Sequence, residues 1–356
     1  MRVLHLAAGN RWTGAAAPAF AEVEALRQAG IDAHFAYVGG YKLHAKLRHH
    51  DFAHPIIARA QNPVSFLRTA GILEKLIERH GFDIVHAHLT YDHWLARVAV
   101  HDTPSKLVRT FHARRVLRAD PFTRSLVRRS DAICVVNDTF GESEAVRRSH
   151  PVFTPPPLDQ RQFDPEGPDV RDIYGISSGT RLIATIGKLS KDRGFEAVLE
   201  TFALVRKRVS DVRLMIIGHG EHRAALEAYA QVLGVAPDLI WAGYHEDDLA
   251  EHYRAADVLL FTARGSDEGH RAVLEAMACA TLPAVYPIEG VSTLLDDLAP
   301  ELISHDATPA ALAEVVMRLV ELPDLADLRR RVRDRSDWFA YDRAAARLLA
   351  VYHAVM

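Results

Sequence analysis

The sequence predicts an α/β protein with two doubly wound, Rossmann-like domains. Strand and helix patterns alternate in two successive series, and each series is long enough to build one parallel sheet. A proline-rich segment at residues 152–165, VFTPPPLDQRQFDP, separates the two series. The length of 356 residues suffices for two domains with separate cores. We place the first domain at residues 1–165 and the second at residues 166–338.

Composition indicates an ordinary soluble globular protein, with 49% hydrophobic and 25% charged residues. The net charge of −3 gives no indication of a nucleic-acid partner. The two cysteines, Cys134 and Cys279, both lie in apolar runs, so we expect no disulfide and a reducing cytoplasm. The apolar part of the N-terminus is too short for a secretion signal. No apolar run reaches the roughly 18 residues that a membrane-spanning helix needs.

The first domain opens with a strand, a loop of small residues and a helix. Strands are expected at residues 3–8, 32–38, 83–87, 107–111 and 132–136, and helices at residues 19–29, at residues 63–80 and from about Thr139. The loop at residues 9–17 follows the carboxyl end of the first strand, where open parallel sheets bind ligands. Gly14 in this loop either contacts a ligand or makes a tight turn.

Histidines gather at the ends of two first-domain strands. His86 and His88 alternate along a strand and would point to one face, with Asp92 and His93 close behind. By residue type these groups could hold a metal ion, and packed histidines are the alternative. His112 directly follows the strand at residues 107–111, so it is either placed to reach a cleft or packed at the surface.

Two stretches of the first domain are strongly basic. Residues 114–129 begin with Arg114 and end with Arg129, and their arginines alternate with apolar residues. Such a pattern suits an anionic lipid surface, and a solvated basic helix is the alternative. The second stretch begins with Lys42, includes Arg48, and is expected to form a surface loop or helix.

The second domain repeats the alternation. Strands are expected at residues 182–186, 213–217, 240–242, 258–261 and 284–286, and helices from Phe195 and at residues 249–255, 271–279, 309–322, 325–336 and 343–355. The loop GKLSKDRG at residues 187–194 ends its first strand, and Lys188 and Arg193 bracket it. Two cations at a strand end suit a diphosphate. Gly218 begins a Gly-x-Gly, which alone is a weak signal.

Residues 266–280, SDEGHRAVLEAMACA, join a loop to a helix in the second domain. The first turn of a helix suits a phosphate, and Gly269 lets a ligand approach the backbone. Two carboxylates, Asp267 and Glu275, stand eight positions apart, where they could accept hydrogen bonds from sugar hydroxyls. The alternative is that Asp267 caps the helix and Glu275 is a solvated helix residue.

This stretch resembles the acidic-x7-acidic signature of the retaining glycosyltransferases of family 4, which have the GT-B fold. The usual signature begins with Glu and ends Glu-Ala-Met-Ala-Cys-Gly. This chain departs from it with Asp267 in place of the first Glu, the extra acid Glu268, and Ala280 in place of the Gly. In the loop after the first strand of the second domain, Lys188 and Arg193 exchange the family's Arg and Lys.

The resemblance implies two domains that face each other across a cleft, with a C-terminal helix at about residues 339–356 returning to the first domain. It implies that the donor sits mainly on the second domain. The residues that would bind the donor or act in catalysis are Gly14, His112, Gly187, Lys188, Arg193, Gly218, Gly243, Tyr244, Asp267, Gly269, His270, Arg271, Ala272 and Glu275. No metal and no cofactor are expected, because the family works without them.

The resemblance further implies transfer of a sugar from a nucleotide sugar, with UDP as the default nucleotide, to a glycan or lipid-linked acceptor. Retention of the anomeric configuration and a role in bacterial polysaccharide, lipopolysaccharide or glycolipid assembly are expected, at the inner face of the cytoplasmic membrane if the basic stretches bind lipid. Two alternatives stay open: a nucleotide-sugar epimerase with the same fold, and a non-catalytic scaffold subunit.

Overall fold

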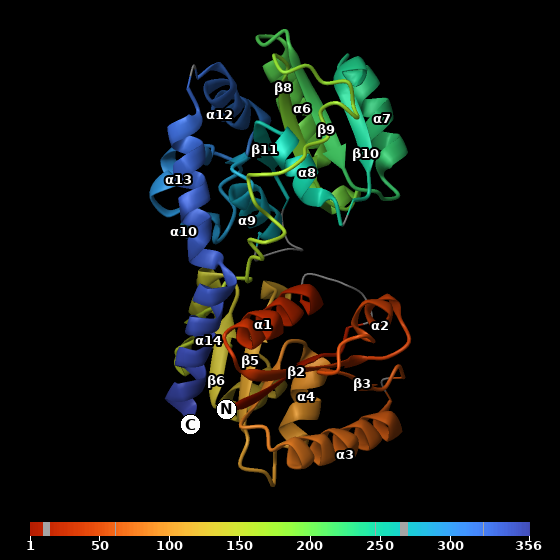
Figure 1. Ribbon diagram of the computed structural model, residues 1–356, viewed down its shortest axis with the longest axis vertical. Coiled ribbons are helices and arrows are strands. Elements are labelled where there is room, and N and C mark those ends of the chain that lie inside the picture. The colour runs from red at the N-terminus through yellow and green to blue at the C-terminus, as the bar shows by residue number, and fades with distance from the viewer. Residues whose placement is uncertain (10–14, 61, 246, 264–269, 323) are drawn as a thin grey trace. The chain divides into compact units, whose positions relative to one another are not determined.

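The computed structural model describes residues 1–356 except 10–14, 61, 246, 264–269 and 323 (Figure 1). The chain divides into two compact units. Unit 1 contains Met1–Pro157 and Phe339–Met356, and unit 2 contains Leu158–Ser266 and His270–Trp338. The division therefore falls after Pro157, within the proline-rich segment, whereas the sequence places it at residue 165.

In the described part of unit 1, seven parallel strands form one sheet in the order β3-β2-β1-β4-β5-β6-β7. The strands are β1 (Arg2–Ala7), β2 (Asp32–Val38), β3 (Ala53–Ile57), β4 (Ile84–Ala87), β5 (Lys106–Phe111), β6 (Ala132–Val135) and β7 (Val152–Phe153). Successive strands extend the sheet to one side from β1 to β3 and to the other side from β4 to β7, so the strand order reverses between β1 and β4. This is the topological switch point at which doubly wound sheets bind ligands.

Helices cover both faces of this sheet. They are α1 (Ala16–Gln28), α2 (Lys42–Leu47), α3 (Pro63–His80), α4 (Thr90–Ala99), α5 (Pro121–Arg128) and α14 (Tyr341–Val355), with 3-10 turns η1 (Arg114–Val116), η2 (Asp138–Glu142) and η3 (Arg147–Ser149). One core packs α1 and α14 against the sheet, and a second core packs α3 and α4 against it. Figure 1 shows α1 and α14, from opposite ends of the sequence, in one layer.

In the described part of unit 2, five parallel strands follow the order β10-β9-β8-β11-β12. The strands are β8 (Arg181–Ile186), β9 (Val212–Ile217), β10 (Leu239–Gly243), β11 (Val258–Phe261) and β12 (Leu282–Val285). The helices are α6 (Phe195–Arg206), α7 (Arg223–Val232), α8 (Leu249–Ala255), α9 (Arg271–Ala278), α10 (Val291–Leu295), α11 (Ala299–Leu302), α12 (Pro309–Glu321) and α13 (Ala326–Ser336), with 3-10 turns η4 (Lys191–Arg193), η5 (Ala236–Asp238), η6 (Asp296–Leu298) and η7 (Asp337–Phe339). Here the switch point lies between β8 and β11.

Three local expectations differ from the structure. The helix expected from Thr139 is only the 3-10 turn η2, because Asn137 accepts a hydrogen bond from the Thr139 N–H and Gly141 disfavours a longer helix. The sequence analysis did not predict β3, α4 or α7. Pro283 lies inside β12, which tolerates it as the edge strand of the sheet next to β11. No helix within the described ranges is long and apolar enough to cross a membrane.

A mostly buried carboxylate ties the start of the unit 2 sheet to its helices. Asp257 Oδ2 accepts hydrogen bonds from the Leu182 N–H at 2.9 Å and from Arg171 at 3.0 Å. Asp257 Oδ1 accepts one from Arg329, on α13, at 2.8 Å. The Asp257 side chain is 11% exposed, so removing it would leave two guanidinium groups short of an anion in a poorly solvated place.

We therefore expect Asp257→Ala to lower the free energy of unfolding of unit 2 by about 3 kcal/mol. Calorimetric melting of the two variants Asp257→Ala and Asp334→Ala checks this, because the Asp334 side chain is 62% exposed and its change should be nearly neutral. Equal melting temperatures for the two variants would contradict the structural role of Asp257.

Candidate functional site

The loops after β8, β9 and β10 are joined by backbone hydrogen bonds. The Gly187 N–H donates to the Ile217 carbonyl at 3.0 Å, and the Gly218 N–H donates to the Gly243 carbonyl at 2.6 Å. Beyond them the Leu189 N–H donates to the His219 carbonyl at 3.0 Å. Three of the glycines that the sequence analysis singled out thus lie together at the carboxyl edge of the sheet.

Close approach of backbone to backbone is the reason for these glycines. A Cβ atom on Gly218 would lie 1.9 Å from the Gly187 carbonyl oxygen, and one on Gly220 would lie 2.1 Å from the Leu189 carbonyl oxygen. Gly218 also has a φ of +143°. The loop after β8 reaches β11 in the same way, because the Thr262 hydroxyl donates to the Gly194 carbonyl at 2.9 Å. The loops on both sides of the switch point are therefore in contact.

The two cations of the loop after β8 are placed differently. Lys188 is exposed, and its Nζ lies 3.1 Å from Glu221 Oε1, an exposed ion pair of the kind that is worth little. Arg193 ends the turn η4, which the Ser190 hydroxyl stabilises by donating to Asp192 Oδ1 at 2.6 Å. This hydrogen bond is the main reason that the pKa of Asp192 is lowered. The ion pair of Lys188 with Glu221 was not foreseen from the sequence.

Glu275 is a buried carboxylate and not the solvated helix residue of the alternative interpretation. It is 6% exposed. Its Oε1 lies 3.0 Å from Arg271 Nε on the same helix, and its Oε2 accepts a hydrogen bond from the Tyr253 hydroxyl at 3.1 Å. Burial, and then the Glu275 charge, raise the pKa of Tyr253 well above its usual value, so Tyr253 remains a donor. These two contacts hold the carboxylate in one orientation.

The turn that opens α9 is strained. His270 has a φ of +50°, is buried, and its Nε2 lies 2.7 Å from the Glu289 carbonyl oxygen, which fixes its ring. Ala272 follows in the first turn of α9, partly exposed. Asp267 and Gly269 lie outside the residues that the structure describes, as does Gly14 in unit 1.

Tyr244 lies directly after β10 and presents an open aromatic ring. It is 60% exposed, and its ring meets that of His219 edge-on at 5.2 Å between centroids. A ring so placed at the strand-end edge of unit 2 has a face with which a planar group could stack.

In unit 1, His112 is a neutral and buried histidine. It follows β5, is 8% exposed, and its Nε2 lies 2.9 Å from His88 Nδ1. Burial, with a smaller contribution from the Arg109 charge, lowers the pKa of His112 to about 3. His112 is therefore uncharged at neutral pH.

His86 and His88 point to one side of β4, as their alternation predicts, and both are fully buried. The two residues expected near them are engaged elsewhere. Asp92 accepts backbone hydrogen bonds from Ala8 at 2.9 Å and Leu89 at 2.7 Å, and His93 Nε2 lies 2.8 Å from the Ser130 hydroxyl oxygen. The actual neighbours of His86 and His88 are His5 and Glu22.

The sequence analysis missed both of these neighbours. His5 lies within the apolar strand β1, and Glu22 lies on the buried face of α1. A polar residue in an otherwise buried stretch was the only available signal.

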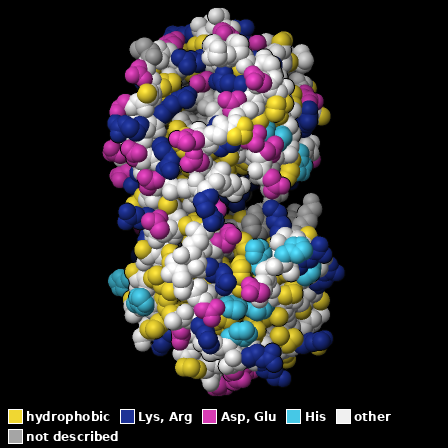
Figure 2. All heavy atoms as spheres, viewed as in Figure 1, with side chains coloured by type: hydrophobic (Ala, Val, Ile, Leu, Met, Phe, Trp, Pro, Cys, Tyr) yellow, Lys and Arg dark blue, Asp and Glu magenta, His cyan; other side chains and the backbone are white. Residues whose placement is uncertain are grey.

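Some arginines of the basic stretch at residues 114–129 contact other parts of unit 1, and all six are exposed. Arg114 donates to the Thr139 hydroxyl oxygen at 2.8 Å, and Arg124 lies 3.5 Å from Glu144. Phe122, on α5, is nevertheless 72% exposed. The other basic stretch forms α2, and Figure 2 shows histidine and Lys/Arg side chains mixed on the visible face of unit 1.

We expect Gly218→Ala to lower the free energy of unfolding of unit 2 by about 3 kcal/mol, because the Cβ clashes with a carbonyl oxygen and φ is positive. Gly234→Ala is the matched control: its φ is +72° but nothing lies within 4 Å, so only the φ strain of about 1 kcal/mol applies. Denaturant titration of both variants measures the difference. Equal costs would show that the contact between the loops is not tight.

Comparison with known proteins places this fold. The family model described as "Glycosyl transferases group 1" matches residues 168–337, and that described as "Glycosyltransferase Family 4" matches residues 12–143. The 2-deoxystreptamine glucosyltransferase of Streptomyces kanamyceticus is 28% identical over 51% of this chain and 48% of its own length. A GDP-mannose-dependent alpha-(1-6)-phosphatidylinositol dimannoside mannosyltransferase of Mycobacterium tuberculosis is 29% identical over 63% of this chain and 57% of its own length. The chain spans about half the length of the curated relatives it matches.

Solved structures agree over the whole chain. A glycosyltransferase from Rickettsia africae superposes with a TM-score of 0.84 at 16% identity, covering 99% of this chain and 98% of its own. Anabaena HepE, solved in complex with UDP, superposes with a TM-score of 0.82 at 14% identity, covering 99% of this chain and 100% of its own. The two parallel sheets are therefore the two Rossmann-like domains of a GT-B fold. Since the two family models between them match most of both units, the chain belongs to the family 4 glycosyltransferases, the glycosyl transferases group 1.

Proposed function

We propose that this protein transfers a sugar from a nucleotide-sugar donor to a hydroxyl group of a glycan or lipid-linked acceptor. The observation that carries the proposal is the strand-end edge of unit 2, where glycine loops in backbone contact present Lys188 and Arg193, and where α9 holds the buried carboxylate of Glu275. The cations of Lys188 and Arg193 suit a diphosphate, and the carboxylate of Glu275 suits the ribose hydroxyls of the same nucleotide. The names of the relatives, among them glucosyl- and mannosyltransferases, support this class of reaction.

Each donor part is assigned to residues of the chain. Lys188, Arg193 and the backbone at the start of α9 hold the diphosphate, and Arg193 can do so with two parallel hydrogen bonds. Glu275 accepts hydrogen bonds from the ribose hydroxyls. The support is its burial and fixed orientation.

The remaining assignments rest on the family resemblance. Tyr244 and Gly243 lie near the base, Asp267 holds the sugar, His112 contacts it, and Gly14 contributes from the loop after β1.

We propose that the reaction retains the anomeric configuration and needs no metal at the diphosphate. The leaving diphosphate assists attack by the acceptor hydroxyl on the same face of the sugar, and takes up its proton while the glycosidic bond to the diphosphate breaks. Lys188 and Arg193 stabilise the charge that develops on the diphosphate. No carboxylate nucleophile is evident in the motifs of the first domain, and a trapped covalent glycosyl-enzyme would contradict this route.

We favour UDP as the nucleotide. Structural neighbours were solved with UDP or UDP-glucose, whereas several relatives are named GDP-mannose-dependent, so the base is an outcome of the test below. We propose an acceptor in bacterial polysaccharide, lipopolysaccharide or glycolipid assembly, at the cytoplasmic side of a membrane. The exposed Phe122 beside the arginines of α5 supports contact with an anionic bilayer.

A thermal shift series identifies the donor. UDP, GDP or ADP, alone or as a sugar conjugate, should raise the melting temperature of the native protein by mass action. The Lys188→Ala plus Arg193→Ala variant and the Glu275→Ala variant should lose most of that shift. Lys207→Ala, an exposed change on the same unit, should keep it.

The same series separates the alternatives. A nucleotide that stabilises the protein, with turnover that needs no acceptor and changes only the sugar, would indicate an epimerase. The absence of any shift and of any hydrolysis would favour the scaffold function and remove the support for the donor residues.

Metal removal tests the proposed diphosphate chemistry. With the donor identified, transfer in the presence of a chelator should proceed at the rate seen with added Mg²⁺ or Mn²⁺. The reason is that Lys188 and Arg193, and not a metal ion, stabilise the charge on the leaving diphosphate. Proton NMR of the product should show the donor's anomeric configuration. A rate that falls at least tenfold with chelator and returns with Mg²⁺ would contradict this proposal.

A further inference from the structure

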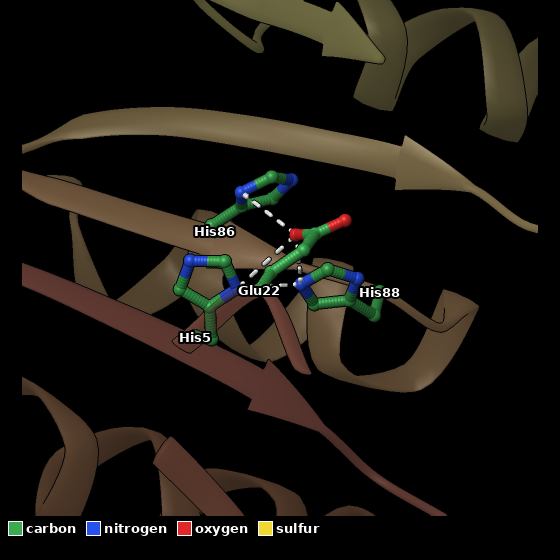
Figure 3. Close-up of side chains that lie close together, drawn as sticks. All are labelled: His5, Glu22, His86 and His88. Atoms are coloured by element: carbon green, nitrogen blue, oxygen red, sulfur yellow. Dashed lines mark hydrogen bonds and ion pairs between the residues drawn. The ribbon is translucent and has the colours of Figure 1, made fainter. Parts of the chain in front are cut away.

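Three histidines and a glutamate converge inside unit 1. His5 comes from β1, His86 and His88 from β4 and the residue after it, and Glu22 from α1. All four side chains are buried, with relative exposures of 0–1%. Figure 3 shows the Glu22 carboxylate between the three imidazole rings.

The distances around Glu22 are too long for hydrogen bonds. Its Oε2 lies 3.5 Å from His5 Nδ1, 3.7 Å from His88 Nε2 and 4.0 Å from His86 Nδ1. Neither carboxylate oxygen has a hydrogen-bond partner among the described residues. A carboxylate left without hydrogen bonds in the protein interior is strongly unfavourable unless another charge compensates it.

The same distances lie near the edge lengths of a coordination tetrahedron, within about half an ångström. Zinc binds imidazole nitrogen and carboxylate oxygen at about 2.0–2.2 Å, so neighbouring ligand atoms in a tetrahedral site lie about 3.3–3.6 Å apart. Of the six edges, the one from Glu22 to His5 matches, those from Glu22 to His88 and His86 are longer, and His5 Nδ1 to His88 Nε2 is shorter at 2.9 Å. Small shifts of these side chains would therefore accompany metal binding. We propose that His5, Glu22, His86 and His88 bind one divalent transition-metal ion, with zinc as the best match to a set of three imidazoles and one carboxylate.

The outer nitrogens of the three histidines already have partners, as metal-binding histidines require. His86 Nε2 lies 2.7 Å from the Thr110 hydroxyl oxygen, and His5 Nε2 lies 3.1 Å from the Tyr352 hydroxyl oxygen. His88 Nδ1 lies 2.9 Å from His112 Nε2. These contacts fix the tautomers that leave the inner nitrogens free of protons for a metal. Two contacts of the inner nitrogens must give way, because the Tyr352 hydroxyl oxygen also lies 2.8 Å from His86 Nδ1 and His5 Nδ1 lies 2.9 Å from His88 Nε2.

The site is closed and therefore structural. Four protein ligands complete a tetrahedron and leave no position for a substrate, and burial denies access to solvent. The ion would hold α1 against the sheet and, through Tyr352, the helix α14. Through His88 it would also fix the ring of His112. This departs from the expectation of no metal in the protein, and leaves the metal-free chemistry proposed for unit 2 unchanged.

The rival account is a hydrogen-bonded cluster without metal. A continuous chain of contacts from His112 through His88, His5, Tyr352 and His86 can be satisfied by choice of tautomers. In that account Glu22 is protonated, because burial raises its pKa well above the usual value. The two accounts differ in whether purified protein contains metal.

The test measures metal in the full chain, with any purification tag removed, produced in zinc-supplemented medium and dialysed against a chelator. A buried ion enters during folding and is retained, so we expect about one zinc per chain. Glu22→Gln keeps the shape of the side chain but loses its charge, and should retain at most a tenth of that zinc. Native protein refolded with Co²⁺ should show the intense visible absorption of a four-coordinate site.

His245→Gln is the matched control. His245, Asp248 and His252 form a second group of ligand type, but both nitrogens of His245 already face Asp248 and the Ala242 carbonyl oxygen. This variant should keep the full zinc content. Native protein with less than a tenth of an equivalent of metal, both as isolated and after refolding with Zn²⁺ or Co²⁺, would overturn the proposal even if Glu22→Gln fails to fold. A folded Glu22→Gln that binds as much zinc as the native chain would overturn it too.

Discussion

Contact of backbone with backbone between the loops after β8 and β9 is the constraint on which the strand-end edge of unit 2 depends. The position of Gly218 against the Gly187 carbonyl leaves no room for a side chain, so the two loops are held as one surface. Thr262 joins that surface to β11 across the switch point. Lys188 and Arg193 then project from a base whose shape is set by main-chain atoms and varies little with side-chain motion.

The buried carboxylates of the two units differ in their hydrogen-bond and ion-pair partners. In unit 2, Glu275 has Arg271 and Tyr253 as partners, so it is compensated within its own helix and the one before it. In unit 1, Glu22 lies among three imidazoles without a hydrogen bond from any described residue. A compensated carboxylate can remain charged and receive a ligand. An uncompensated one must be protonated or meet a cation, and this difference is why we assign donor binding to one and a metal to the other.

The sequence predicted most strands, because buried parallel strands are continuous apolar runs bounded by glycines and polar loops. It predicted a helix at residues 63–80, and α3 has these bounds in the structure, with Gly81 as its C-cap. The helix from Thr139 was wrong, because side-chain capping at Asn137 competed with it. The His5 and Glu22 cluster could not be predicted, since its members meet only when α1, β1 and β4 pack. The family resemblance supplied the roles of the donor residues, which spacing alone left open.

The packing of α14 on α1 has a consequence for how the protein is made. The core of unit 1 needs Tyr341, Leu348 and Tyr352, but the ribosome synthesises these only after all of unit 2. Unit 2 contains Leu158–Ser266 and His270–Trp338, so it is synthesised before those three residues and can fold as soon as it emerges. The unit that begins first is therefore completed last, and nascent unit 1 exposes the apolar face of α1 throughout synthesis of unit 2. Chaperone binding to the nascent chain should concentrate there.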